Sequence, residues 1–139
     1  MAGTPTDLLN RIVSLLSGSG TLAIIGETGL LNFRNNALTN VPIQIKAVAG
    51  QTRGWNLINL NTIPVYVKLY DSLAASVIVG TTTVVRTLAI PASGAFFLEA
   101  QSISQDDFLT AISIACVTGL LDNNVTAPAI AIHAGVRYK

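Results

Sequence analysis

The side chains that most often perform acid–base or nucleophilic chemistry are few in this sequence and far apart. His133 is the one histidine, and it lies among the apolar residues Ala131, Ile132 and Ala134. A catalytic histidine needs an oriented nucleophile and a third group that positions the ring. No such set can be named from the sequence. A structural, partly buried histidine is therefore the favoured interpretation.

The single cysteine, Cys116, is flanked by Ile114, Ala115 and Val117. A reactive thiol requires a nearby positive charge, which these neighbours do not supply, so we interpret Cys116 as a small core residue. One cysteine cannot form an intrachain disulfide. A zinc site needs three or four ligands, and one histidine and one cysteine on separate predicted strands do not provide them. We expect no metal ion and no other cofactor.

Carboxylates could support glycoside hydrolysis if two of them faced each other across a cleft. Asp106 and Asp107 are adjacent, so their side chains diverge if the segment is extended. A solvated loop is favoured there over a calcium site, and residues 122–124 are first of all a turn. These observations predict a protein that is not an enzyme. The seven acidic residues are Asp7, Glu27, Asp71, Glu99, Asp106, Asp107 and Asp122.

The aromatic residues allow two interpretations, a platform for stacking on sugars or core packing, and core packing is favoured. The basic residues are scattered and do not alternate with aromatics, and the net charge is +1. Both features argue against a nucleic-acid surface. The aromatic residues in question are Trp55, Tyr66, Tyr70, Phe96 and Phe97.

The composition indicates a surface that is largely covered by protein. Charged residues make up 11% of the 139 residues, against about 25% in average globular domains. The hydrophobic fraction is 50%, although aromatics contribute only 6%. The apolar run 108–121 is shorter than the ~20 residues that a membrane-spanning helix needs, and no signal peptide is visible. We therefore expect a soluble protein that is made in a reducing cytoplasm, with no membrane partner.

The elements that must position these residues are predicted to be strands, most clearly at residues 64–70. Val65, Val67 and Leu69 fall on one face of that strand, and Tyr66 and Lys68 fall on the other. Residues 111–117 form a continuous apolar run, which predicts a strand that is buried on both faces.

Further strands are predicted at 43–47, from residue 55 onward, and at 75–79, 84–90, 95–98 and 129–138. Turns are expected between Gly50 and Gly54 and at residues 91–94, and a short helical turn is expected within 103–108. Asn56, Asn59 and Asn61 are expected to mark the fraying end of the strand that starts at Trp55. Seven or eight short strands at this spacing are typical of a sandwich or barrel. We predict an all-β fold, an antiparallel, jelly-roll-like β-sandwich.

The first 40 residues are predicted to form an N-terminal helical or extended arm, with a helix over 5–17 and a loop after it, before a β domain at 41–139. Thr4 and Pro5 suit a helix start, and residues 17–20 suit its end. The helix carries an apolar stripe that either packs on its own domain or docks on a neighbouring subunit. The stripe residues proposed for this interaction are Leu8, Leu9, Ile12, Val13 and Leu16.

Residues 54–71, residues 90–94 and the strand at 112–118 with its downstream turn are similar to small β-sandwich structural proteins of tailed bacteriophages. Among these, the head cement (decoration) proteins are the most similar. The resemblance covers residues 43–139 and implies a virion protein on the outer surface of the capsid. It further implies that the protein forms homotrimers and binds and stabilises the lattice of the major capsid protein.

Two alternatives remain open at this point. One is a tail, fibre or baseplate component of the same sandwich class. The other is a carbohydrate-binding module, which predicts an exposed Trp55 or Tyr66.

Overall fold

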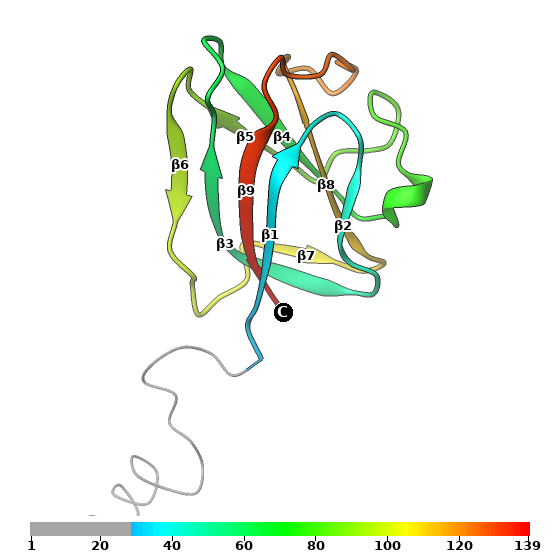
Figure 1. Cartoon of the computed structure of the whole chain (residues 1–139). Coiled ribbons are helices and arrows are strands. Elements are labelled where there is room, and N and C mark those ends of the chain that lie inside the picture. The colour runs from blue at the N-terminus through cyan, green and yellow to red at the C-terminus, as the bar shows by residue number, and fades with distance from the viewer. Residues whose placement is uncertain (1–28) are drawn as a thin grey trace, which may run out of the picture.

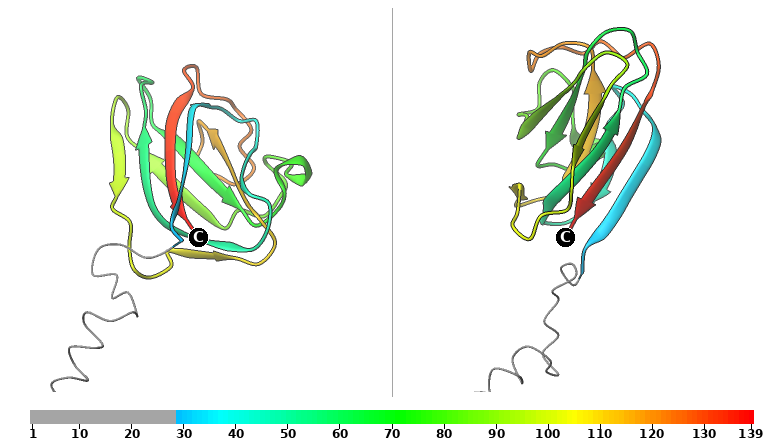
Figure 2. Two further views of the ribbon diagram at one scale, coloured as in Figure 1. Left: turned by 60° about the horizontal axis from the view of Figure 1, so that its bottom comes forward. Right: turned by 90° about the vertical axis from the view of Figure 1, so that its left-hand side faces the viewer.

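The computed structural model describes residues 29–139, and these residues form two antiparallel sheets that pack face to face (Figures 1 and 2). One sheet has the strand order β1-β9-β3-β6, with β7 also pairing with β3, and the other has the order β2-β8-β4-β5. This confirms the predicted all-β sandwich. The described elements are β1 Leu31–Leu38, β2 Ile43–Lys46, β3 Gly50–Ile58, β4 Val65–Tyr70, the 3₁₀ turn η1 Ala74–Ser76, β5 Arg86–Ile90, β6 Ala95–Leu98, β7 Asp106–Phe108, β8 Ile112–Val117 and β9 Ile132–Tyr138.

Strand β4 confirms the strand predicted at 64–70. Val65, Val67 and Leu69 are fully buried and belong to the core between the sheets. Lys68 and Tyr70 point to the opposite face and are buried as well. Residues 71–85, which include η1, lie against that outer face, where Val77, Val79 and Val84 pack on Tyr70 and Ala115.

Strand β8 lies between β2 and β4, and all six of its residues are buried, as the apolar run predicted. Cys116 is fully buried in the core cluster, so its interpretation as a small core residue is confirmed. Burial raises the pKa of the Cys116 thiol to about 12, although a backbone hydrogen bond at Tyr66 opposes the shift.

Strand β1 lies inside the range that the sequence assigned to the arm. Its residues pair with β9 in antiparallel register, from Leu31 opposite Tyr138 to Leu38 opposite Ile132. The predicted boundary at residue 40 is therefore too late, because residues 31–38 are an edge strand of the sandwich. Polar residues fit an edge strand because one side of its backbone is not paired. The expected helix over 5–17 and its apolar stripe lie outside the described residues.

The turn predicted between Gly50 and Gly54 is wrong, because both glycines lie within β3. A Cβ at Gly54 would lie 2.6 Å from the carbonyl oxygen of Leu98, and one at Gly50 would lie 2.6 Å from that of Lys139. Each glycine thus permits close approach of another chain segment, a role that glycine often has within strands.

Two further local predictions are wrong. Residues 75–79 do not form a strand but belong to η1 and the loop that covers Tyr70. The helical turn expected within 103–108 is replaced by the strand β7, which pairs with β3 from Phe108 opposite Gly50 to Asp106 opposite Thr52. In both cases long-range pairing and burial decide the local structure.

Candidate functional site

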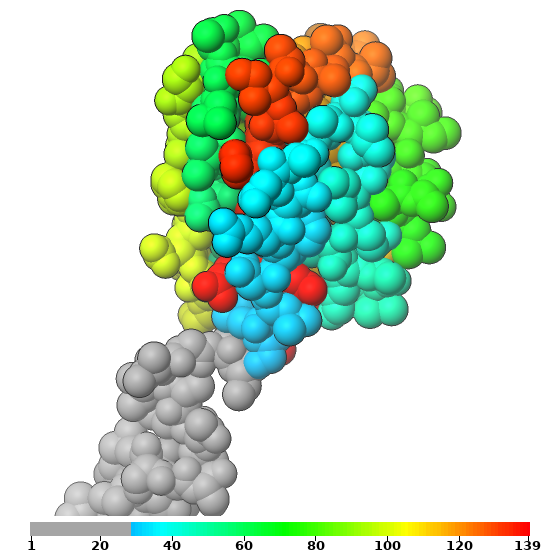
Figure 3. Space-filling view, viewed as in Figure 1, coloured from blue at the N-terminus to red at the C-terminus, as the bar shows by residue number. Residues whose placement is uncertain are grey.

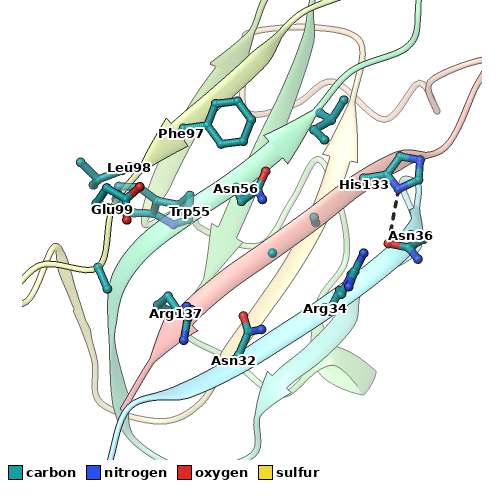
Figure 4. A pocket seen from close by; sticks show the side chains of 14 residues that line it. Asn32, Arg34, Asn36, Trp55, Asn56, Phe97, Leu98, Glu99, His133 and Arg137 are labelled. Carbon is teal, nitrogen blue, oxygen red and sulfur yellow. Dashed lines mark hydrogen bonds between the residues drawn. The ribbon is translucent and has the colours of Figure 1, made fainter. Parts of the chain in front are cut away.

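The outer face of the sheet β1-β9-β3-β6, away from the core, carries a shallow pocket of about 370 Å³ (Figure 4). We call this pocket the polar groove. Its lining comes from β1, β9, β3 and β6 and from the segment after β6. The lining residues are Asn32, Arg34, Asn36, Trp55, Asn56, Ile58, Phe97, Leu98, Glu99, Ala100, His133, Ala134, Gly135 and Arg137.

Strand register builds the centre of the polar groove as a row across the sheet. Arg34 on β1 is opposite Gly135 on β9, Gly135 is opposite Asn56 on β3, and Asn56 is opposite Phe97 on β6. Neighbouring strands lie about 4.8 Å apart, so the row from Arg34 to Phe97 is roughly 14 Å long. Gly135 has no side chain to fill the space between Arg34 and Asn56, which leaves a depression in the middle of the row.

Two more pairs of polar residues flank this row. Asn32 is opposite Arg137 on one side. On the other side, His133 Nδ1 lies 3.3 Å from Asn36 Oδ1, which fits a hydrogen bond. Both flanking pairs join β1 to β9, and Figure 4 shows their side chains on the same face of the sheet as Asn56. His133 is partly buried, as the sequence predicted.

The charges that line the polar groove are two guanidinium groups and one carboxylate. Within the described part of the chain, the side chains of Arg34 and Arg137 form no hydrogen bond or ion pair. The carboxylate is that of Glu99, in the segment that follows β6. The groove is therefore polar with an excess of positive charge, and its guanidinium donors are available to a ligand.

A second distinct surface lies at one end of the sandwich, at the top in Figure 1, where four connecting segments meet. We call residues 39–42, 59–64, 91–94 and 118–131 together the apolar end. In Figure 3 the segments 39–42, in cyan, and 118–131, in orange, adjoin on the molecular surface. Seven of the fifteen exposed large hydrophobic residues in the described chain belong to it: Val41, Leu60, Ile63, Leu120, Leu121, Val125 and Ile130.

The apolar end contains one charged residue, Asp122. Its carboxylate accepts a hydrogen bond of 3.2 Å from Lys68 Nζ, whose side chain is buried beneath the segment. Lys68 also donates to Thr87 Oγ1 and to the carbonyl oxygen of Leu120. The only charge at this surface thus has a partner of opposite sign.

Buried asparagine side chains hold the loops of the apolar end together. Asn59 Nδ2 donates to the carbonyl oxygens of Ile63 and Pro91 at 2.9 and 3.0 Å. Asn61 Nδ2 donates to the carbonyl oxygen of Ile130 at 2.8 Å, and Asn61 Oδ1 accepts the Ile130 N–H at 2.7 Å. The expectation that Asn59 and Asn61 mark a fraying strand end is wrong, because both are buried hydrogen-bonding centres.

The predicted divergence of the paired acids is confirmed on β7. Asp106 Oδ2 accepts a hydrogen bond of 2.6 Å from Arg86 Nε, whereas Asp107 Oδ1 accepts one of 2.8 Å from Ser104 Oγ. Among residues 29–139, no three histidine, cysteine or acidic side chains are close enough together to hold a metal ion. In the same residues, no helix is long and apolar enough to cross a membrane.

The aromatic residues divide between core and surface. Trp55 is 4% exposed and Tyr70 is fully buried, and Phe96 packs against the core with its ring centroid 6.4 Å from that of Trp55. Phe97 differs from them, because its side chain is 63% exposed beside the polar groove. The interpretation of Phe97 as a core residue is wrong, and so is a sugar platform built on Trp55.

Sequence reasoning did not identify Arg34, Asn56, Phe97 or Arg137 as members of one site. They lie on four strands, and only the register of the sheet brings them together. The alternation of β9 offered a partial signal, since it places His133, Gly135 and Arg137 on one face. The residues predicted for interaction, in the stripe Leu8 to Leu16, lie outside the described residues.

Comparisons with known proteins leave the family open. No family model and no curated protein matches the chain. A crystal structure of PirA is similar over 84% of this chain and 99% of that chain, with a TM-score of 0.37 and 10% sequence identity. A likeness of this size does not bear on the function.

Proposed function

We propose that this protein is a non-enzymatic virion structural protein of a tailed bacteriophage, a capsid cement or decoration protein. In this proposal it forms homotrimers on the outer surface of the shell and stabilises the lattice of the major capsid protein. The observation that carries the proposal is the apolar end, a surface of exposed aliphatic side chains with one charge that is already paired.

The chemistry of the apolar end is that of the centre of a protein–protein interface. Such centres are depleted of charged residues, and exposed apolar groups gather there because their burial drives association. Single exposed leucines are common on protein surfaces and need no explanation. Here, instead, three of the four connecting segments at one end of the sandwich carry seven exposed large aliphatic side chains, which favours a protein partner.

The hydrogen bonds of Asn59 and Asn61 add a second supporting argument. Surface loops usually lose conformational freedom when they bind, and this loss weakens association. Here the loops 59–64, 91–94 and 118–131 are already joined by buried side-chain amides. A preformed surface suits a protein that must fit a repeated site on a shell. The resemblance of residues 43–139 to phage cement proteins points to the same setting.

The proposal is tested by sizing the purified protein with light scattering and by measuring its co-sedimentation with assembled capsids. We expect a trimer in solution and saturable binding to capsids. The double variant Leu120→Ser/Leu121→Ser removes two exposed side chains of the apolar end and should weaken capsid binding at least tenfold. The matched control Val48→Ser/Leu109→Ser removes two exposed side chains from the β2–β3 and β7–β8 connections, which lie at the opposite end of the sandwich in Figure 1. It should bind like the unmodified protein.

A monomeric protein that does not sediment with capsids would refute the proposal, and so would equal losses for the two double variants. Locating the protein on intact particles by electron cryomicroscopy separates the capsid from the tail, fibre or baseplate. Density on the tail would replace the cement role by the tail alternative.

The N-terminal segment provides a separate test of how the protein attaches. Because the sequence predicts an apolar stripe within residues 8–16, deletion of residues 1–20 should reduce capsid occupancy while the β domain stays folded. Full occupancy by the shortened protein would contradict a role of that segment in attachment.

A further inference from the structure

We infer that the polar groove binds an acidic oligosaccharide, a short chain of sugar rings that carries carboxylates. This is a binding activity distinct from attachment through the apolar end. The inference is based on the side chains that line the groove, on their spacing across four strands, and on the depression at Gly135.

Side-chain amides are the first feature that matches a sugar. Asn32, Asn36 and Asn56 are all exposed along the polar groove. Each amide offers both donors and acceptors, and a sugar hydroxyl also donates and accepts. Because the groove is open, water can solvate the amide groups that have no protein partner, and a ligand with the same hydrogen-bonding capacity can replace that water.

The exposed ring of Phe97 is the second feature. It lies at the β6 end of the central row, next to Asn56 in the sheet register. An exposed aromatic ring provides a flat apolar surface, on which the C–H face of a sugar ring can stack. The structure thus retains the sugar-stacking hypothesis, with Phe97 in place of Trp55.

The two guanidinium groups specify the charge of the ligand. Arg34 stands at the β1 end of the central row, and Arg137 is one row away on β9. A guanidinium binds a carboxylate through two parallel N–H donors, and neither group has a competing partner in the described chain. The roughly 14 Å between the backbones of Arg34 and Phe97 provides room for two or three sugar rings.

A nucleic acid fits these observations less well. Phosphate recognition relies on many basic side chains, whereas the polar groove offers two guanidinium groups together with the carboxylate of Glu99. The net charge of +1 gives little long-range attraction for a polyanion. An acidic oligosaccharide, a hydroxyl-rich chain with spaced carboxylates, matches the lining of the polar groove more closely than a nucleic acid does.

The inference is tested on the full-length protein with a galacturonic acid trisaccharide and its methyl-esterified form, which has the same rings without the charges. Binding is measured by titration calorimetry and located by amide shifts in NMR spectra. We expect the acid to shift residues of the polar groove and the ester to bind about tenfold more weakly or worse. Losing one charge-assisted contact in Arg34→Gln or Arg137→Gln should likewise weaken binding about tenfold or more. Lys46→Gln, on the other sheet, should not weaken it.

Two further variants separate binding from folding. Gly135→Leu fills the depression, and its backbone tolerates a side chain because a Cβ would meet no atom closer than 3.5 Å. Phe97→Ala removes an exposed ring and leaves the core unchanged. Both should lose binding while the melting temperature stays near that of the unmodified protein.

Equal affinity for the acid and its ester would overturn the inference. The absence of binding at millimolar concentration, or tighter binding of a uridine hexanucleotide than of the trisaccharide, would also overturn it. Capsid attachment through the apolar end is measured separately, so failure of one proposal does not decide the other.

Discussion

Replacing Asn61 with alanine should destabilise the fold and loosen the apolar end. The Asn61 side chain is 3% exposed and makes three hydrogen bonds. Its Nδ2 donates to Asn59 Oδ1 at 2.9 Å and to the carbonyl oxygen of Ile130, and its Oδ1 accepts the N–H of Ile130. Alanine removes all three bonds. It also separates the loop 59–64 from the segment that leads into β9.

The expected size follows from these bonds. A neutral hydrogen bond contributes about 0.5–1.5 kcal/mol net, so three of them contribute roughly 1.5–4.5 kcal/mol. Asn59 Oδ1 keeps the backbone N–H of Asn61 as a donor, and Ile130 lies at the surface where water can reach it. These two facts place the estimate near the middle of the range, at about 3 kcal/mol. For a chain of this length the loss corresponds to roughly 10 °C in melting temperature.

Urea unfolding followed by circular dichroism measures the change, with Asn123→Ala as the matched control. Asn123 lies in the segment 118–131 with an exposed side chain, so its replacement should change stability by less than about 0.5 kcal/mol. Hydrogen exchange at the Ile130 amide should accelerate in Asn61→Ala and not in Asn123→Ala. If the free energy of unfolding of Asn61→Ala lies within 1 kcal/mol of that of the unmodified protein, the side-chain amides do not stabilise the arrangement of the loops.

Two other positions give independent tests. Burial would raise the pKa of the Asp71 carboxyl, but hydrogen bonds from the backbone N–H groups of Thr110, Leu109 and Ala111 outweigh it and lower the pKa below 3.8. The carboxylate therefore stabilises the fold above the unfolded-state pKa, and this contribution is lost as the pH falls through the folded-state value. Asp71→Asn should cost about 1–2 kcal/mol near pH 7. The difference should shrink in urea titrations below pH 4, and a constant difference across pH would contradict this assignment. Gly54→Ala should cost about 1–3 kcal/mol because its Cβ would lie 2.6 Å from the Leu98 carbonyl oxygen, whereas Gly135→Ala should be nearly neutral. Thermal unfolding measures the stability of both glycine variants. Equal stability would show that the Leu98 carbonyl group leaves room for a side chain at Gly54.

The strand pattern of this sequence predicted the fold class because burial follows a period of two wherever one face of a strand meets the core. Val65, Val67 and Leu69 are the clearest case, and β8 is recognisable as a strand buried on both faces. The prediction of a turn at Gly54 failed because glycine occurs in turns and also at strand positions where another chain segment approaches closely. No residue near Gly54 in the sequence indicates that the carbonyl group of Leu98 lies next to it in the fold.

The polar groove could not be predicted because it depends on which strands are neighbours. Asn56 and Asn59 are three residues apart, yet one lines an open surface and the other is buried among loop carbonyls. Their side chains are identical, so only the fold determines whether each amide meets a ligand or the backbone. Strand order involves contacts across about 100 residues, such as Arg34 opposite Gly135, and a single sequence does not encode that order in any local signal.

The two proposed surfaces make different physical demands on the same sandwich. The apolar end lies at the tips of connecting segments (Figure 1), whereas the polar groove lies on the face of a sheet (Figure 4). Effects at separate sites that share no partner usually add, so variants of Arg34 should not alter capsid binding and variants of Leu121 should not alter saccharide binding. A protein held to a shell by its apolar end would still leave the sheet face accessible to solvent and ligand. Coupling between the two measurements would instead show that one partner covers both surfaces, and the groove would then belong to the interface with the shell.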